Sequence, residues 1–546
     1  MTERRATARE AVALIADDFT ELPYPARDSA PDGPLGWPGY DASRARAAER
    51  TGEAESVICG TATVEGTRAV LIAFEFGFLG GSLGERTGDR LEAAYVHARA
   101  HRLPVVPLVA TGGSRMQEGM LALTQLQRVA RQSALTREAG LPQIAVLRDP
   151  TTGGGWATLG AGADVTLALP GAQVGFAGSR VRPADADPAA YTAEAQVAAG
   201  AVDAIVRPEE LRGVLGRWLR LLAEPTAREA SRPPDGGVEG AAPGRTARPE
   251  GAAPGPTARS EQTAPGPTAR SEQAALSQVP PKTPGTTTPE TGPTAPKAPT
   301  AQDTTGRAAP EASRTAAPAA APLPAALGLR DLPATGWDAV RRARSSERPR
   351  AEAYLSAYFT DRVTLSGDRC GGTDPDGMLC GFGDHEGRTI AYAAQTGTAT
   401  RPAGYRTATR LIRLADRLGI PVLTLVDTPG AANDAEAERQ GVGTAIADLF
   451  GAVASARVPI TTLLIGEGGS GGALALAAPG NTWATPDSYF SVIAPESAAA
   501  ILKRPPEEVE TTADQLRIRP QDLAELGVIR AAEQGRPRPE PGERRS

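Results

Sequence analysis

The sequence predicts an α/β protein that contains two copies of one domain, because two patterns recur in both halves of the 546-residue chain. Apolar runs of strand length alternate with segments of helix length, which is typical of buried parallel strands joined by helices. In each half, a strand that begins with proline is followed 38 residues later by a second such strand, which leads into a glycine cluster. These prolines are Pro104 and Pro142 in the first half and Pro421 and Pro459 in the second.

Composition divides the chain further. Residues 224–330 are rich in Pro, Ala, Thr, Gly and Ser, and they cannot bury enough apolar surface to offset the entropy of folding. We expect a long disordered linker there. Near the N-terminus, an amphipathic stretch around residues 11–19 predicts a short helix, and no apolar signal-peptide core precedes it. The predicted segments are an N-terminal helix and tail (1–31), a first domain (32–223), the linker (224–330), a second domain (331–535) and a C-terminal tail (536–546).

Each predicted element of the first domain has a counterpart in the second. In the first, the order is a strand at 104–109, a loop at 111–114, a strand at 142–147, a glycine turn at 149–155, a helix at 156–161 and a short strand at 174–178. In the second, it is a strand at 421–426, a loop at 427–430, a strand at 459–465, a glycine turn at 466–472, a helix at 473–478 and a short strand at 489–493.

The glycine pairs Gly153–Gly154 and Gly471–Gly472 indicate the chemistry of the site. A strand that ends in Gly-Gly before a helix presents free backbone N–H groups, and such a nest binds an oxyanion or a phosphate. Glycine is required where a Cβ would block the ligand or forbid a positive φ. One such turn is more often a packing turn. Two in corresponding places favour a pair of anion-binding sites.

Other classes of protein are disfavoured. The net charge of −6 argues against nucleic-acid binding, and no apolar run is long enough to span a membrane. The motifs of P-loop, dinucleotide-binding and serine-hydrolase folds are absent from the sequence. Cys370 and Cys380 lack the spacing of a metal site and are expected to be ordinary buried thiols, while His97 and His101 are expected at the surface. Scattered cysteines indicate a reducing compartment, so we expect a cytoplasmic protein.

At this point the residues match a known family. The first domain resembles the β subunit of bacterial acetyl-CoA carboxylase carboxyltransferase, and the second resembles its α subunit, over roughly residues 32–222 and 337–533. The matching stretches of the first domain are Phe74–Gly84, Gly112–Gly119, Asp149–Gly154, Gly175–Val181 and Gly200–Val206. Those of the second are Gly367–Arg369, Pro402–Arg406, Asp427–Ala431, Gly466–Ala475 and Ser491–Glu496.

The resemblance implies a crotonase-like (ClpP-type) fold in each half, with the active site between them. In this family N1-carboxybiotin breaks down to CO2 and an enolate-like biotin anion. That anion takes a proton from the α-carbon of an acyl-CoA thioester, and the resulting enolate attacks CO2. The implied partners are a biotin carboxyl carrier protein, biotin carboxylase and the acyl-CoA, with biotin carried on the partner protein. The chain is expected to form a homodimer equivalent to an α2β2 assembly.

The resemblance also implies roles for particular residues. Each oxyanion hole would take one N–H group from a glycine pair and another from the preceding loop. The implied catalytic residues are Gly112, Gly113, Gly153, Gly154, Gly430, Ala431, Gly471 and Gly472. The implied substrate-binding residues are Gly80, Gly81, Ser82, Arg115, Phe176, Ala177, Gly178, Arg406, Ser491 and Ile493.

The chain departs from the family pattern in three places. Residues 1–31 contain no cysteine, so the zinc ribbon common in β subunits is not expected and no zinc is predicted. Residues 395–398 replace a Lys-Gly-Arg segment, and Ala432 replaces an aromatic residue. We therefore predict carboxyl transfer to acetyl-CoA, giving malonyl-CoA. The alternatives are propionyl-CoA or another acyl-CoA as acceptor, a biotin-dependent decarboxylase, or a non-catalytic scaffold that binds the carrier protein.

Overall fold

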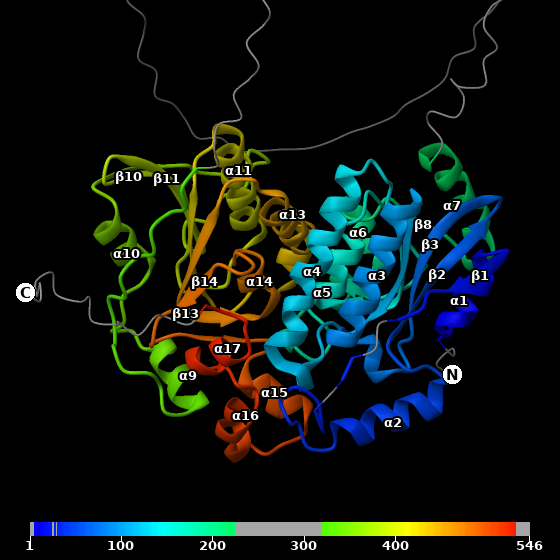
Figure 1. Cartoon of the computed structure of the whole chain (residues 1–546), viewed down its shortest axis with the longest axis horizontal. Coiled ribbons are helices and arrows are strands. Elements are labelled where there is room, and N and C mark those ends of the chain that lie inside the picture. Colours follow the sequence, from blue (N-terminus) through cyan, green and yellow to red (C-terminus); the bar gives the residue numbers. More distant parts are fainter. Residues whose placement is uncertain (1–4, 25–26, 29, 224–317, 531–546) are drawn as a thin grey trace, which may run out of the picture. The chain divides into compact units, whose positions relative to one another are not determined.

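The structure is a computed structural model that describes residues 5–24, 27–28, 30–223 and 318–530. Most of the predicted linker (224–317) and the predicted C-terminal tail lie outside the described residues. Both halves of the chain belong to one compact unit. Each half contains one mixed β-sheet with helices on both faces, so the predicted α/β fold with two copies of one domain is confirmed (Figure 1).

The first half is built on a sheet with the strand order β1-β2-β3-β4-β5-β6-β8, and β7 pairs with the end of β5. Strands β2 and β3 form an antiparallel hairpin, whereas β3, β4, β5 and β6 are parallel. The elements in chain order are α1 (Ala8–Ile15), β1 (Asp18–Glu21), α2 (Tyr40–Thr51), β2 (Val57–Val64), β3 (Thr67–Phe74), η1 (Leu79–Gly81), α3 (Glu85–His101), β4 (Val105–Thr111), η2 (Met116–Glu118), α4 (Gly119–Glu138), β5 (Ile144–Thr152), α5 (Gly153–Gly155), η3 (Trp156–Gly160), β6 (Val165–Ala168), β7 (Val174–Gly175), η4 (Pro188–Tyr191), α6 (Ala193–Ala198), β8 (Ala204–Ile205) and α7 (Pro208–Ala223).

The second half repeats this plan in a sheet of order β14-β13-β12-β11-β10-β9, with β15 paired to the end of β13. Its elements are α9 (Gly336–Arg344), α10 (Ala351–Tyr358), β9 (Asp361–Thr364), β10 (Met378–His385), β11 (Arg388–Gln395), α11 (Pro402–Leu418), β12 (Val422–Thr428), α12 (Ala435–Arg439), α13 (Val442–Ser455), β13 (Ile460–Gly469), α14 (Ser470–Leu474), β14 (Thr482–Ala484), β15 (Tyr489–Ser491), α15 (Pro495–Ile501), η5 (Pro506–Glu508), α16 (Val509–Gln515) and α17 (Pro520–Glu525).

The two copies correspond residue by residue around their glycine turns. From β4 through the first glycine turn, adding 317 to a residue number gives its counterpart in the second half. Strand β4 shifts its register against β5 before Thr111, which then pairs with Thr151. Strand β12 shifts against β13 at the corresponding place, before Thr428, which pairs with Gly468. The two halves, whose similarity was first seen in the spacing of the prolines, therefore also share this register shift between neighbouring strands.

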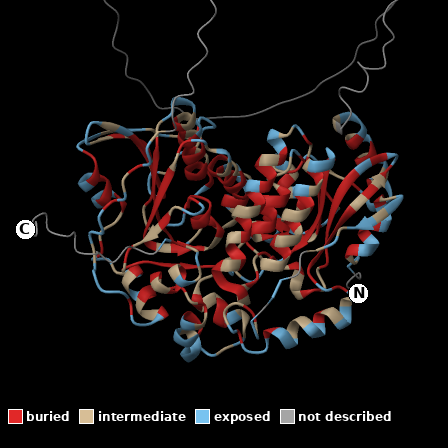
Figure 2. Ribbon diagram, viewed as in Figure 1, coloured by how far each residue is buried: buried red, intermediate tan, exposed pale blue. Residues whose placement is uncertain are grey.

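The hydrophobic core joins the two halves. One face of the first sheet is covered by α1 and α7 and one face of the second by α10, each enclosing a core of its own. The opposite faces carry α3 and α4 in the first half and α11 and α13 in the second. The apolar residues under these four helices form one continuous buried cluster (Figure 2). Helices α4 and α13 pack against each other, α4 also contacts α14, and α13 contacts η3.

Three predictions of local structure are wrong in detail. The N-terminal helix ends at Ile15, and Phe19 lies in β1, which pairs with β2, so this segment is part of the first sheet rather than a tail. Residues 318–330, predicted as linker, contact the second half: the Ala321 carbonyl accepts from Thr461 Oγ1 at 2.8 Å. The helix expected at 473–478 instead spans Ser470–Leu474.

Candidate active site

The first glycine turn is held in place by a preceding loop. Thr111 ends β4, and its Oγ1 accepts the backbone N–H of Gly113 at 3.0 Å. Gly113 and Gly153 both have positive φ, 105° and 64°, and a Cβ added to Gly153 would lie 3.2 Å from Gly113 Cα. The N–H of Gly112 donates to Gly80 O at 2.9 Å. The loop amides of Gly112 and Gly113 are therefore used to fix the loop.

The second turn repeats this geometry with a change of residue. Thr428 Oγ1 accepts the N–H of Gly430 at 3.1 Å, as its counterpart Thr111 does in the first turn. The positive φ that Gly153 adopts in the first turn is adopted here by Ser470, at 55°. The counterparts of Gly154 and Gly155 are Gly471 and Gly472. The sequence-based pairing of Gly153–Gly154 with Gly471–Gly472 is thus displaced by one residue.

Residues that were not selected from the sequence anchor the second turn. The carbonyl of Gly472 accepts from Gln395 Nε2 at 3.2 Å and from the Tyr405 hydroxyl at 3.1 Å. A Cβ on Gly472 would lie only 2.5 Å from the backbone nitrogen of Ala431. Gln395 is the first residue of the segment that departs from the family pattern, and it is fully buried against the turn. The residue that replaces the family pattern at this position therefore helps to support the second turn.

A buried ion pair fixes the strand ends below the second turn. Asp427 Oδ1 accepts from Arg348 Nη2 at 2.6 Å and from the N–H of Glu467 at 3.1 Å. Burial raises the pKa of Asp427, although the Arg348 guanidinium acts in the opposite direction. The carboxylate thereby connects β12, β13 and the segment that precedes α10.

The two turns meet across the contact between the halves. Leu126, on α4, lies between them: its Cδ1 atom would be 2.4 Å from a Cβ on Gly154 and 3.7 Å from one on Gly471. Because both distances are measured to the same atom, the Cβ positions of Gly154 and Gly471 are at most about 6 Å apart. Phe176, from the segment after β7, also contacts the second turn, with Cζ 3.5 Å from the Gly471 Cβ position. One chain therefore brings both glycine turns to one place.

Reciprocal contacts hold the halves together around this place. Trp156, directly after the first turn, is completely buried and fills the space above Gly443 in α13. Gly443 is the counterpart of Leu126, so the equivalent position of each long helix contacts the turn region of the other half. Gln127 Nε2 donates to the carbonyl of Ala477 at 2.8 Å, after α14. The packing of the two halves thus has an approximate twofold character.

The substrate-binding role predicted for Arg115 does not fit its placement. Its side chain is 1% exposed, and its Nη2 atom lies 2.5 Å from Oε1 of Glu55. It also donates to the Ser82 carbonyl at 2.7 Å. Burial by itself would raise the pKa of Glu55, yet the Arg115 guanidinium holds it below its usual value. Arg115 supports the loop from within, and its guanidinium is bonded to protein groups.

The other predicted substrate-binding residues divide into two groups. Gly80 and Gly81, both with positive φ, and Ser82 lie behind the first loop; a Cβ on Gly81 would be 2.1 Å from the Ala110 carbonyl. Arg406 is bound to Asp368 at 2.7 Å. The second group lies beside the glycine turns. Its members are Phe176, Ala177 and Gly178 after β7, Ser491 at the end of β15, where it pairs with Gly469, and Ile493 two residues later.

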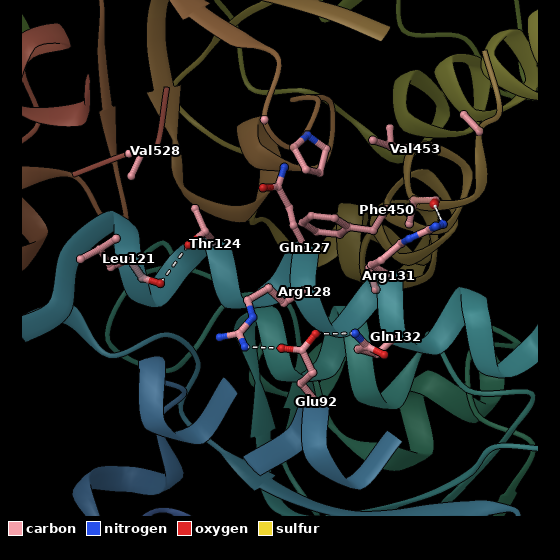
Figure 3. A pocket seen from close by; sticks show the side chains of 16 residues that line it. Glu92, Leu121, Thr124, Gln127, Arg128, Arg131, Gln132, Phe450, Val453 and Val528 are labelled. Carbon is pink, nitrogen blue, oxygen red and sulfur yellow. Dashed lines mark hydrogen bonds and ion pairs between the residues drawn. The ribbon is translucent and has the colours of Figure 1, made fainter. Parts of the chain in front are cut away.

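A separate cavity of about 540 Å³ opens between α4 and the second half (Figure 3). The glycines of the two turns do not line it. Arg128 points into it from α4 and is paired with Glu92, which also accepts from Gln132 Nε2 at 2.5 Å. Arg131 donates to the Ala454 carbonyl at 2.7 Å. Protein groups therefore already pair with both arginines of this cavity.

Among the described residues, no group of three or more His, Cys, Asp or Glu side chains is arranged to hold a metal ion. Cys380 is buried, but Cys370 is exposed, contrary to the expectation of two buried thiols. No helix in the described ranges is both long and apolar enough to cross a membrane.

Each half of the chain matches a known protein family. Residues 38–205 match the carboxyl transferase domain family, and residues 332–532 match the acetyl co-enzyme A carboxylase carboxyltransferase-like family. The two matches therefore define a protein with two carboxyltransferase domains on one polypeptide.

Relatives match the chain along almost its whole length. It is 35% identical over 542 residues to the acetyl-coenzyme A carboxylase carboxyl transferase subunits beta/alpha of Salinispora arenicola, covering 96% of this chain and 81% of the relative. A probable biotin-dependent acyl-coenzyme A carboxylase beta3 subunit of Mycobacterium tuberculosis is 30% identical, with coverages of 95% and 85%. A transcarboxylase 12S crystal structure is 17% identical, with coverages of 96% and 86% and a TM-score of 0.34. The chain belongs to the family of fused β/α carboxyltransferases of bacterial acetyl-CoA carboxylase, whose members are biotin-dependent acyl-CoA carboxyltransferases.

Proposed function

We propose that this protein transfers the carboxyl group from N1-carboxybiotin, carried on a biotin carboxyl carrier protein, to acetyl-CoA, giving malonyl-CoA. The observation that carries the proposal is the meeting of two matched glycine turns at Leu126. The reaction forms two anions, one on the ureido oxygen of biotin and one on the thioester oxygen of the acyl-CoA. Two adjacent sets of backbone N–H groups suit these two charges.

The donors follow from the hydrogen bonds of the loops. The N–H groups of Gly112, Gly113 and Gly430 are occupied within the protein. The first-turn amides of a helix have no partner within the helix, and no side chain caps the helices that begin at Gly153 and Ser470. We therefore assign the oxyanion contacts chiefly to the amides of Gly154 and Gly471, with Ala431, whose nitrogen faces Gly472, as a second donor in the second turn.

The chain's own residues then do three things in the reaction. The amides stabilise negative oxygen as it forms, Leu126 and Phe176 provide an apolar boundary between the turns, and the two halves hold both reactants in one orientation. The proton that leaves the α-carbon of the thioester goes to the biotin anion. The new C–C bond joins that carbon to CO2.

A reverse assay tests this function without the carrier protein. Purified full-length chain is mixed with biocytin and either malonyl-CoA or methylmalonyl-CoA, and acetyl-CoA and propionyl-CoA are measured by mass spectrometry. We expect biocytin-dependent formation of acetyl-CoA. If propionyl-CoA is the preferred product, the acceptor in the forward reaction is propionyl-CoA and not acetyl-CoA. Acyl-CoA formed equally without biocytin would refute carboxyl transfer to biotin.

The assembly is a separate proposal. We propose a homodimer that works with a carrier protein and biotin carboxylase, in line with the family. Light scattering should give twice the mass of one chain, and the mass of a single chain would contradict the dimer.

A further inference from the structure

Glu438 is a buried carboxylate of the second half that accepts hydrogen bonds from the first. It lies on α12 and is 1% exposed. Its Oε1 atom accepts the N–H of Ala177 at 3.0 Å, and its Oε2 atom accepts from Gln196 Nε2 at 3.5 Å. An unpaired buried carboxylate is costly, so these donors are required partners and not incidental neighbours.

The backbone that Glu438 holds is the one that carries Phe176. Glu438 Oε1 is 3.2 Å from the Cβ position of Gly175, directly before Phe176. The Phe176 ring in turn covers Gly471 in the second turn. A single carboxylate thus connects α12 to the segment of the first half that borders the proposed site.

The charged and titratable groups around Glu438 make their hydrogen bonds and ion pairs with other residues, although the charge of Arg182 also acts to lower the pKa of Glu438. Arg182, on the same segment of the first half, donates from Nε to the Ala177 carbonyl at 3.1 Å. The Tyr191 hydroxyl donates to the Asn433 carbonyl at 2.8 Å. On α12 and its N-cap, Arg439 pairs with Asp187, and Asp434 pairs with Arg401. In the described part of the chain, no Arg or Lys forms an ion pair with Glu438.

This environment places the ionisation of Glu438 near neutrality. Burial raises its pKa to about 7, although the N–H groups of Ala177 and Phe176 act in the opposite direction. Because the folded-state pKa lies above the ordinary value of 4.5, ionisation costs stability as the pH rises between these two values. The ionised carboxylate is, however, the stronger acceptor for the Ala177 amide.

We propose that Glu438 is a positioning residue for carboxyl transfer: it holds the Phe176–Ala177 backbone of the first half against the second glycine turn. The inference rests on the proposed function for the reaction it serves. The contact itself is a property of the fold and can be measured independently.

Two substitutions separate positioning from simple stability. Glu438→Leu removes the acceptor, whereas Glu438→Gln keeps an acceptor oxygen but cannot ionise. Glu436→Gln is the matched control, because Glu436 lies on the same helix and is exposed. In the biocytin assay, we expect Glu438→Leu to lower kcat about tenfold or more while KM for malonyl-CoA changes less than about threefold, since small displacements at a reacting site are costly. Glu438→Gln should restore most of kcat at about pH 6, where the wild-type carboxyl group is largely protonated, and Glu436→Gln should match the wild type at every pH.

The pH profile is the second readout. The ratio of wild-type to Glu438→Gln kcat should rise between about pH 6 and about pH 8, because only the wild type gains the ionised acceptor. A flat ratio would overturn the proposal, and this test needs only the conservative variant should Glu438→Leu fail to fold. A kcat of Glu438→Leu within about twofold of wild type would also overturn it.

Hydrogen exchange distinguishes failure of this inference from failure of the function. Peptides that cover residues 174–178 should exchange faster in Glu438→Leu than in Glu436→Gln, because the Ala177 N–H loses its acceptor. Unchanged exchange would refute the proposal that Glu438 holds this backbone, whether or not the enzyme is active. If Glu438→Leu exchanges faster but the wild-type protein transfers no carboxyl group, the contact of Glu438 with the Ala177 backbone is supported and only the proposed reaction is refuted.

Discussion

The glycines of the two turns differ in how much side chain they tolerate. A Cβ on Gly154 would lie 2.4 Å from Leu126, and one on Gly472 would lie 2.5 Å from a backbone nitrogen, so both substitutions disturb packing as well as chemistry. A Cβ on Gly471 would make only ordinary contacts, and this residue is not among those with positive φ. Gly471 is therefore the position at which chemistry can be altered with little change in the fold.

Gly471→Ala should lower kcat of carboxyl transfer by at least about tenfold, because a methyl group beside Phe176 obstructs the approach of an oxyanion to the amide; complete loss of one such donor costs about 10²–10³ in rate. Melting temperature should stay close to that of wild type. Gly451→Ala is the control, since no atom beyond the adjoining residues and backbone of its own helix lies within 4 Å of its Cβ position. Wild-type turnover in Gly471→Ala would exclude this amide from the oxyanion site.

Arg115 is the residue whose predicted role changed most. We expect Arg115→Met to destabilise the protein by about 3–5 kcal/mol, because Glu55 and Glu118 would stay buried without their cation. The pKa of Glu55, now held low by Arg115, would then rise under burial, so the loss of stability should be larger at about pH 8 than at about pH 5. Urea unfolding at the two pH values measures this. Equal losses at both would show that Arg115 contributes packing alone.

At the scale of elements, the sequence predicted the strands better than the turns. Prolines mark the starts of the repeated strands, and apolar runs predict the strands themselves. The counterpart of Gly153 was missed because glycine was matched to glycine, whereas the backbone places Ser470 in the left-handed region. The helix predicted up to Phe19 was too long because pairing with β2 overrides the helical pattern after Ile15. The end of that helix was therefore decided by tertiary pairing, which no local pattern encodes, whereas the spacing of the prolines already aligns Gly153 with Ser470.

The contact of η3 with α13 depends on the absence of one side chain. A Cβ on Gly443 would lie 2.0 Å from Nε1 of Trp156. We expect Gly443→Ala to cost about 1–3 kcal/mol through overpacking, even though alanine favours a helix. Gly451→Ala in the same helix should be neutral or stabilising by up to about 1 kcal/mol. Equilibrium denaturation of both variants gives the comparison, and a stabilised Gly443→Ala would show that Trp156 can move aside at no cost.

At the scale of the whole molecule, the two similar halves share one hydrophobic core, and residues of each half pack against the other. The sequence pattern predicted two similar domains, and the family resemblance implied one site between them, but neither identified the residues that join them. Leu126, Trp156 and Glu438 each contact residues more than 200 positions away, and each is a common residue type within a helical segment. Such contacts carry no local signature, so a single sequence does not reveal them.

The same joint core predicts that the covalent connection between the halves is dispensable for their association. A site-specific protease sequence is inserted between residues 270 and 271, and the chain is cut after folding. The two fragments should elute together from a sizing column and retain reverse activity, because the buried cluster under α4 and α13 is shared. Adding Trp156→Ala, which opens a cavity at this contact and costs about 3–5 kcal/mol, should separate the cut fragments at lower urea than in the cut wild type. Fragments that part without denaturant would mean that the chain connection, and not the shared core, keeps the two glycine turns together.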